Sequence, residues 1–202
     1  MRQSNGVWRS IAFVPDPAVS MMQFLARFRV ALGWVFAPLI LILANPSRES
    51  IVVGSAVALC GEALRIWAAG HLNKAREVTS SGPYRYVAHP LYVGSSIIGL
   101  GLGLASRNLI AMTLIAVYLA VTLRAAIKSE ERFLERTFGD QYELYRSWDR
   151  DGGPSARRSR RFSVALAMAN REYRAVVGLV AAVLLLALKA TYNDVFWRAA
   201  GP

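Results

Sequence analysis

Long apolar runs, separated by short polar stretches, are the dominant pattern of this 202-residue chain. A helix needs about 20 mostly apolar residues to cross a bilayer, and somewhat fewer when residues at its ends reach the interface. Each run is predicted to be helical, because a lone strand leaves its backbone polar groups unpaired in lipid. The pattern predicts five crossings, at Val30–Ala44, Ile51–His71, Pro90–Ala105, Asn108–Ile127 and Ala175–Thr191.

Composition points to the same fold class. Hydrophobic residues make up 54% of the chain, charged residues 18%, and the mean hydropathy is +0.32, which is too apolar for an ordinary soluble domain. We therefore predict an all-α integral membrane bundle of about five transmembrane helices. Its expected parts are an N-terminal cytoplasmic or interfacial segment (1–29), a core of four crossings plus a cytoplasmic amphipathic helix (30–150), a basic linker with a juxtamembrane helix (151–172), and a fifth crossing with the C-terminus (173–202).

The net charge of +11 is distributed unevenly. Four basic residues precede the first crossing, three lie between the second and third, and eleven lie between 128 and 174, whereas the opposite side holds four. Cytoplasmic loops carry an excess of Lys and Arg, so the N-terminus and both polar loops are predicted to be cytoplasmic, in a bacterial inner membrane or the endoplasmic reticulum. Basic residues beside the membrane also suit anionic lipids. No nucleic-acid motif accompanies the charge, and no nucleic-acid partner is expected.

Two polar blocks interrupt the apolar pattern, at 82–94 and at 130–145. Polar groups at membrane depth must be paired or must hold a ligand. Only Ser106–Asn108 separates the third and fourth crossings, which predicts an antiparallel hairpin. The start of the third crossing and the end of the fourth then lie at the same membrane face. His89 and Glu130 are therefore expected to be neighbours in one site.

The two blocks resemble one enzyme family in both sequence and spacing. They read GPYRYVAHPLYVG at 82–94 and EE(x)2L(x)3FG(x)2Y(x)2Y at 130–145, a pattern similar to the isoprenylcysteine carboxyl methyltransferase family with its bacterial, archaeal and phospholipid methyltransferase relatives. The likeness covers roughly residues 51–150, and Ala88 stands where the family usually has Arg. It implies a membrane enzyme that holds S-adenosylmethionine at the cytoplasmic face. The acceptor it implies is lipophilic, either an isoprenylcysteine carboxylate or a phospholipid amine.

The resemblance also implies which residues form the site. The cofactor-binding set comprises Arg76, Glu77, Val78, Thr79, Tyr84, His89, Pro90, Leu91, Tyr92, Glu130 and Tyr145. A carboxylate such as Glu130 suits the ammonium or the ribose hydroxyls of the cofactor, and tyrosine rings suit adenine and the sulfonium. Methyl transfer is a direct displacement that needs no metal. An amine acceptor must lose a proton, and Glu130, Glu131 or His89 could take it.

Charged side chains within the apolar runs are candidate substrate ligands. Arg124 is predicted to orient an acidic head group or to reach the interface, and with Glu131 it forms the expected catalytic pair. Arg65 is predicted to bind substrate or to pair with Glu62, three residues earlier.

Two other function classes remain open from sequence. Membrane sterol reductases share a related helical core and bind a nicotinamide cofactor, but the Glu130-Glu131 pair and the 138–142 segment resemble the methyltransferases better. A membrane scaffold without catalysis is the third alternative, favoured by Ala88 in place of the family's Arg.

Overall fold

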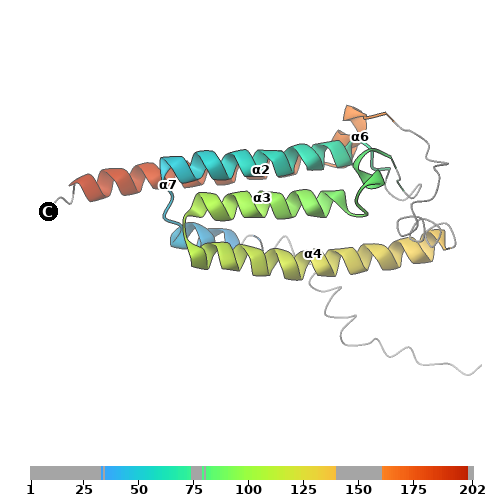
Figure 1. Ribbon diagram of the computed structural model, residues 1–202, viewed down its shortest axis with the longest axis horizontal. Helices are drawn as coiled ribbons and strands as arrows, with labels where there is room; N and C mark the ends of the chain where they lie inside the picture. Colours follow the sequence, from blue (N-terminus) through green and yellow to red (C-terminus); the bar gives the residue numbers. More distant parts are fainter. Residues whose placement is uncertain (1–32, 34, 74–78, 80, 140–160, 200–202) are drawn as a thin grey trace, which may run out of the picture.

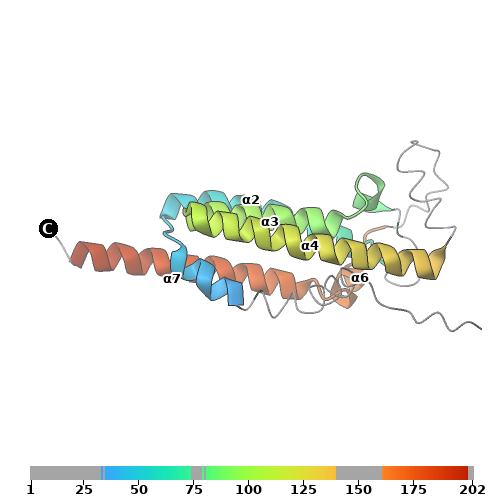
Figure 2. The ribbon, with the colours of Figure 1, turned by 90° about the horizontal axis from the view of Figure 1, so that it is seen from below.

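The computed structural model describes residues 33, 35–73, 79, 81–139 and 161–199. Its elements are α2 (Arg48–Ala69), the short 3-10 helix η1 (Gly82–Arg85), α3 (Pro90–Ser106), α4 (Leu109–Phe138), α6 (Val164–Ala169) and α7 (Tyr173–Ala199). Residues 35–43 are also helical, and no strand occurs in the described part of the chain. The long helices lie side by side along one axis in both ribbon views (Figures 1 and 2). The predicted all-α class is confirmed.

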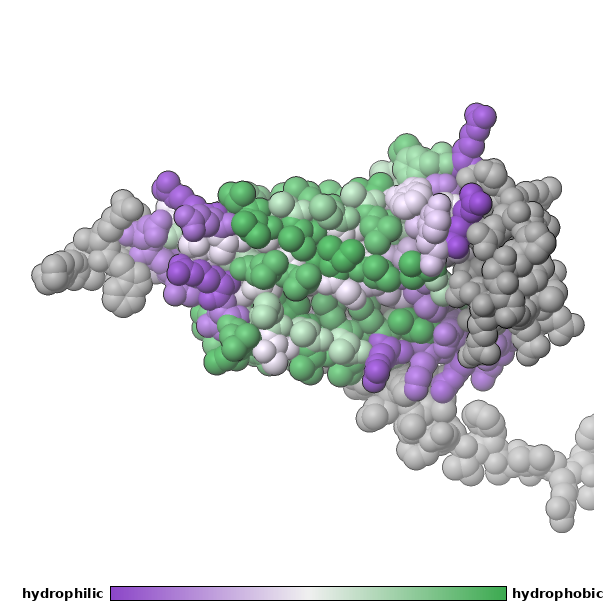
Figure 3. Space-filling model, viewed as in Figure 1, coloured by the Kyte–Doolittle hydropathy of each residue, from purple (hydrophilic) through white to green (hydrophobic). Residues whose placement is uncertain are grey.

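Three helices are long and apolar enough to cross a membrane, over Arg48–Ala69, Leu109–Arg136 and Tyr173–Asp194. The helix α3 is also apolar but has only 17 residues, which is about 26 Å at 1.5 Å per residue. Figure 3 shows a broad apolar band between two polar ends of the bundle. The chain is therefore a helical membrane bundle. The count of five crossings stays a prediction, because residues 30–32 and 34 of the expected first crossing, 30–44, lie outside the described residues and α3 is short.

The helices α2 and α3 pack closely because small residues face each other. A Cβ atom added at Gly101 would lie 2.5 Å from the backbone nitrogen of Ala58 and 2.5 Å from the carbonyl oxygen of Gly54. A Cβ added at Gly61 would lie 2.7 Å from the carbonyl oxygen of Gly94. Small residues let membrane helices approach backbone to backbone. Gly94 likewise serves helix packing, because a Cβ added there would lie 2.8 Å from the carbonyl oxygen of Gly61.

A tight turn joins α3 to α4 as predicted. Arg107 ends α3 in the left-handed region with φ 48°, and the side chain of Asn108 accepts a hydrogen bond of 3.0 Å from the Ala111 amide. This N-cap satisfies a donor that the first turn of a helix otherwise leaves unpaired. The two helices consequently run antiparallel, side by side (Figure 1).

The fourth crossing, expected over 108–127, and the residues that follow it form one helix, because α4 continues without a break to Phe138. Residues 128–138 contain neither Pro nor Gly, so nothing interrupts the helix until Gly139, which has φ 45°. Glu130 and Glu131 therefore lie on the same rigid helix as the apolar crossing.

Hydrogen bonds fix α7 at both of its ends. Near its start, the Asn170 side chain donates to the carbonyl oxygens of Ala69 (2.9 Å) and Leu72 (2.8 Å). Near its other end, the Lys189 ammonium donates to the carbonyl oxygens of Leu41 and Ile42, both at 2.6 Å. The helix α6 lies within 151–172, where a basic linker and a juxtamembrane helix are expected, and residues 151–160 of that segment lie outside the described residues.

Candidate functional site

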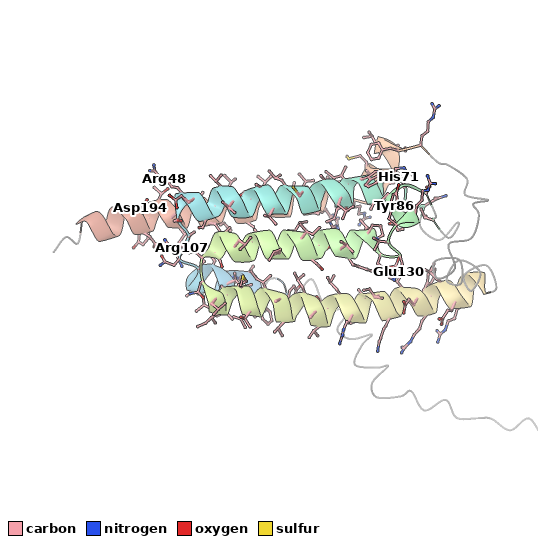
Figure 4. All side chains as sticks on the ribbon, viewed as in Figure 1. Arg48, His71, Tyr86, Arg107, Glu130 and Asp194 are labelled. Carbon is pink, nitrogen blue, oxygen red and sulfur yellow. The ribbon has the colours of Figure 1, made fainter. Side chains whose placement is uncertain are left out.

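The two polar blocks meet at one end of the bundle. Figure 4 places His71, Tyr86 and Glu130 at this end, and Arg48, Arg107 and Asp194 at the opposite end. The start of α3 and the last part of α4 therefore share one face, as the antiparallel hairpin predicts. Which compartment this end faces is a prediction from the charge pattern.

Two contacts join the start of α3 to α4. The hydroxyl of Tyr92 donates a hydrogen bond of 2.7 Å to Oε2 of Glu130. Nε2 of His89 lies 3.7 Å from Oε1 of Glu131. The rings of His89 and Tyr92 have centroids 5.6 Å apart. His89 and Glu130 thus belong to one cluster. Within it, Tyr92 pairs with Glu130 and His89 pairs with Glu131.

The local sequence explains this geometry. Pro90 occupies the first turn of α3, where backbone amides make no hydrogen bond within the helix, so the missing N–H of proline costs nothing. His89 precedes it with φ −129°. The amides of Tyr92 and Val93 bond to the His89 carbonyl, at 3.0 and 3.1 Å. Residues three apart on a helical turn lie on the same side. His89 and Tyr92 consequently both reach toward α4.

An apolar groove of about 590 Å³ lies between α3 and α4 and begins at this cluster. Its lining residues are Val87, Ala88, His89, Tyr92, Val93, Ser96, Gly99, Leu100, Met112, Ile115, Ala116, Leu119, Ala120, Leu123, Arg124 and Ile127. The volume is typical of ligand pockets, which are mostly apolar with a few polar groups that fix orientation. His89, Tyr92 and Arg124 are such polar groups here.

The polar end of the groove is partly open. The side chain of His89 is 20% exposed and that of Glu131 is 37% exposed, so a ligand can reach both. The two carboxylates follow Arg124 by six and seven residues on α4, and the imidazole and the phenol contact them from the start of α3. This arrangement can pair with a cationic group, stack on an aromatic group, and hold an acidic group beside an apolar chain.

The other residues of the expected cofactor set lie in three different places. Thr79 is buried and its Oγ1 accepts from the Asn73 amide at 3.3 Å, while Tyr84 is half-buried in η1, which packs against α2. Pro90 and Leu91 belong to the first turn of α3 but do not line the groove. The remaining four, Arg76, Glu77, Val78 and Tyr145, lie outside the described residues.

The two arginines predicted to bind substrate differ in position. Arg124 lines the groove and is exposed. Arg65 does not line it: Nε of Arg65 donates to Oε1 of Glu172 at 2.7 Å and lies 3.8 Å from Oε2 of Glu62. The expected contact with Glu62 is therefore present but long, and the short one is with a residue that the sequence analysis did not consider.

Sequence reasoning missed most of the groove. Met112, Ala116, Ala120 and Arg124 recur every four residues and form one row of its lining on α4. Residues at this spacing share a helical face, so a row with two alanines that ends in an arginine was the available signal. Glu172 gave no such signal, because its partner Arg65 lies 107 residues away.

Comparison with known proteins identifies the matching region. Residues 49–141 match the family model described as phospholipid methyltransferase. The chain is 35% identical to a protein-S-isoprenylcysteine O-methyltransferase of Schizosaccharomyces pombe, over 46% of this chain and 39% of that protein. It is 33% identical to the cobalt-zinc-cadmium resistance protein CzcN of Cupriavidus metallidurans, over 72% of this chain and 61% of that protein.

A third relative, the nickel-cobalt-cadmium resistance protein NccN of Alcaligenes xylosoxydans xylosoxydans, is 27% identical over 61% of this chain and 62% of that protein. The chain thus spans less than two thirds of the length of each of these relatives. No solved structure matches it. Among the described residues, no group of three or more His, Cys, Asp or Glu side chains could hold a metal ion.

Proposed function

We propose that this chain, whose residues 49–141 match the phospholipid methyltransferase family model, is a membrane methyltransferase that uses S-adenosylmethionine to methylate a lipophilic acceptor. The observation that carries the proposal is the junction of a polar cluster, with two carboxylates and two aromatic rings, and an apolar groove between α3 and α4. A reaction between a water-soluble donor and a lipid acceptor requires such a junction at the membrane surface.

The residues at the polar end fit the proposed cofactor. Glu130 and Glu131 suit an ammonium or sugar hydroxyls, and the rings of His89 and Tyr92 suit adenine or a sulfonium. The hydrogen bond from Tyr92 fixes the orientation of the Glu130 carboxylate before any ligand binds. When bound, the cofactor supplies an activated methyl group. The protein then contributes alignment and exclusion of water, which can supply about 7–11 kcal/mol in favourable cases.

The groove suits the hydrocarbon part of the acceptor. Arg124 stands at its polar end and can pair with a carboxylate or phosphate of the acceptor. A carboxylate acceptor needs no base. An amine acceptor must lose a proton, and Glu131, 3.7 Å from the imidazole of His89, is placed to take part in that transfer. Both acceptor classes therefore remain within the proposal.

Replacing Arg124 with alanine is expected to raise the Michaelis constant of the acceptor about tenfold, since a charged hydrogen-bond partner contributes roughly 1.5–3 kcal/mol. The affinity for S-adenosylhomocysteine should stay within about twofold. Steady-state methyl transfer and calorimetry measure the two quantities. Lys128→Ala is the matched control, because Lys128 is exposed one turn away and does not line the groove. An Arg124 effect confined to cofactor binding contradicts this assignment.

Filling the groove should separate acceptor binding from cofactor binding. Ala120→Trp places a large ring in the groove lining and is expected to reduce methyl transfer about fivefold or more, because overpacking or exclusion of the acceptor costs about 1–3 kcal/mol. S-adenosylhomocysteine should still bind. Val121→Trp, at the next residue and outside the lining, should leave transfer near the wild-type rate. Equal losses in both variants would show that the groove does not hold the acceptor.

The proposed function is tested by incubating the protein in lipid nanodiscs with a methyl-labelled donor and a total lipid extract. A labelled lipid product identifies the acceptor class directly. Calorimetry with S-adenosylhomocysteine and with reduced nicotinamide dinucleotide separates the methyltransferase from a sterol-reductase-like enzyme. Binding of neither compound, together with no labelled product, favours the scaffold and rejects the enzyme.

A further inference from the structure

The side chain of Arg65 joins three separate parts of the bundle. From α2, its Nε donates at 2.7 Å to Glu172, which lies directly before α7 in the short connection from α6. Its Nη1 donates to Oγ of Ser95 and to the carbonyl oxygen of Leu91, the latter at 3.4 Å. Oγ of Ser95 in turn donates to the same Leu91 carbonyl at 2.9 Å. The network therefore ends on the first turns of α3.

This network is well shielded from solvent. The Arg65 side chain is 20% exposed and the Glu172 side chain 8%. The α3 backbone leaves space for it, because a Cβ added at Gly94 would lie 2.5 Å from Cγ of Arg65. A shielded guanidinium is stabilised only when its N–H donors have well-placed hydrogen-bond partners. Because the guanidinium is planar and rigid, it also holds those partner groups in fixed positions. Arg65 can thus hold α3 in one position against α2.

We propose that Arg65, held by Glu172, is a positioning residue for the polar end of the groove. Leu91 lies between His89 and Tyr92 in the chain, so a displacement of this turn moves both side chains relative to Glu130 and Glu131 on α4. Misplacement by about 1 Å in an active site can cost about 100-fold in rate. The functional part of this inference rests on the function proposed above; the structural part does not.

The inference also assigns a role to the C-terminal helices. Glu172 lies beyond residues 49–141, the region that matches the family model. The α6–α7 segment reaches the site through the contact of Glu172 with Arg65 and, beyond it, through Ser95 and Leu91. It acts on the cofactor end without lining the groove itself.

Three variants of the full-length protein test the network. Glu172→Gln removes the charge that holds Arg65, and Ser95→Ala removes one of its two acceptors on α3 while leaving the pair with Glu172. Lys189→Met is the matched control, because it removes the bonds that fix the opposite end of α7. Two quantities are measured in each: the dissociation constant of S-adenosylhomocysteine, and the hydrogen-exchange rate of residues 89–96 in ligand-free protein.

Glu172→Gln and Ser95→Ala are each expected to speed exchange in 89–96 and to weaken S-adenosylhomocysteine binding, both by about tenfold, which corresponds to the loss of one charge-assisted hydrogen bond. Lys189→Met should change neither quantity by more than about twofold, even if it lowers the melting temperature as much as the two test variants do. Unchanged exchange in 89–96 in both test variants overturns the proposal, as does equal loosening of this turn by Lys189→Met. If the wild-type protein does not bind S-adenosylhomocysteine, the proposed function fails, and the exchange rates still decide whether Arg65 positions α3.

Discussion

Replacing Glu130 with alanine is expected to weaken binding of S-adenosylhomocysteine at least tenfold while the protein keeps its fold. Oε2 of Glu130 accepts a hydrogen bond of 2.7 Å from Tyr92, so the carboxylate is held at the polar end of the groove, ready to meet a cationic or hydroxyl group. A hydrogen bond to a charged group contributes roughly 1.5–3 kcal/mol, which corresponds to about 10- to 100-fold in affinity. Isothermal calorimetry on detergent-purified protein measures the change.

Two further variants sharpen this result. His89→Ala should also weaken the affinity, since His89 lies beside Tyr92 and near Glu131. Glu135→Ala removes an exposed carboxylate slightly more than one turn further along α4 and should have little effect on binding. The site assignment is wrong if Glu130→Ala and His89→Ala both bind S-adenosylhomocysteine as tightly as the wild-type protein.

Replacing Gly101 with alanine is expected to destabilise the bundle by about 3 kcal/mol or more, the upper part of the range for overpacked cores. The added Cβ would lie 2.5 Å from two backbone atoms of α2, the nitrogen of Ala58 and the carbonyl oxygen of Gly54. Backbone atoms cannot move aside as the end of a flexible side chain can, so α2 and α3 must separate. Thermal unfolding in detergent should show a clearly lower midpoint.

Gly178→Ala is the matched control for this substitution. Gly178 lies in α7, and a Cβ added there meets nothing within 4 Å. Alanine is a better helix former than glycine by about 1 kcal/mol, so the unfolding midpoint should stay the same or rise slightly. A loss of stability in Gly178→Ala equal to that in Gly101→Ala would mean that close α2–α3 packing is not the cause.

The sequence predicts the hairpin and the shared face of its two polar blocks because both follow from local rules. Three residues between two apolar runs force antiparallel helices, and Pro90 marks where α3 begins. The closeness of His89 to the Glu130–Glu131 pair then follows without knowledge of any other helix. The pairing within the cluster does not follow, because it depends on the rotation of α4 about its axis, which packing against α3 determines.

The partner of Arg65 could not be predicted for a different reason. Within α2 the sequence offers Glu62 at a favourable helical spacing, and this local choice competes with any distant carboxylate. Which distant residue comes near depends on where α6 and α7 return to the bundle, and no periodic pattern encodes that. The outcome is a 2.7 Å contact with Glu172 and a 3.8 Å separation from Glu62. Non-local contacts of this kind are visible only in the folded chain.

Light-induced crosslinking of labelled S-adenosylmethionine, followed by mapping of the labelled peptides, tests the central claim most directly. The polar cluster of His89, Tyr92, Glu130 and Glu131 should place the label within residues 82–96 or 124–145, and excess S-adenosylhomocysteine should abolish it. A label that S-adenosylhomocysteine displaces from the opposite end of the bundle, beside Arg48, Arg107 and Asp194 (Figure 4), would contradict the account.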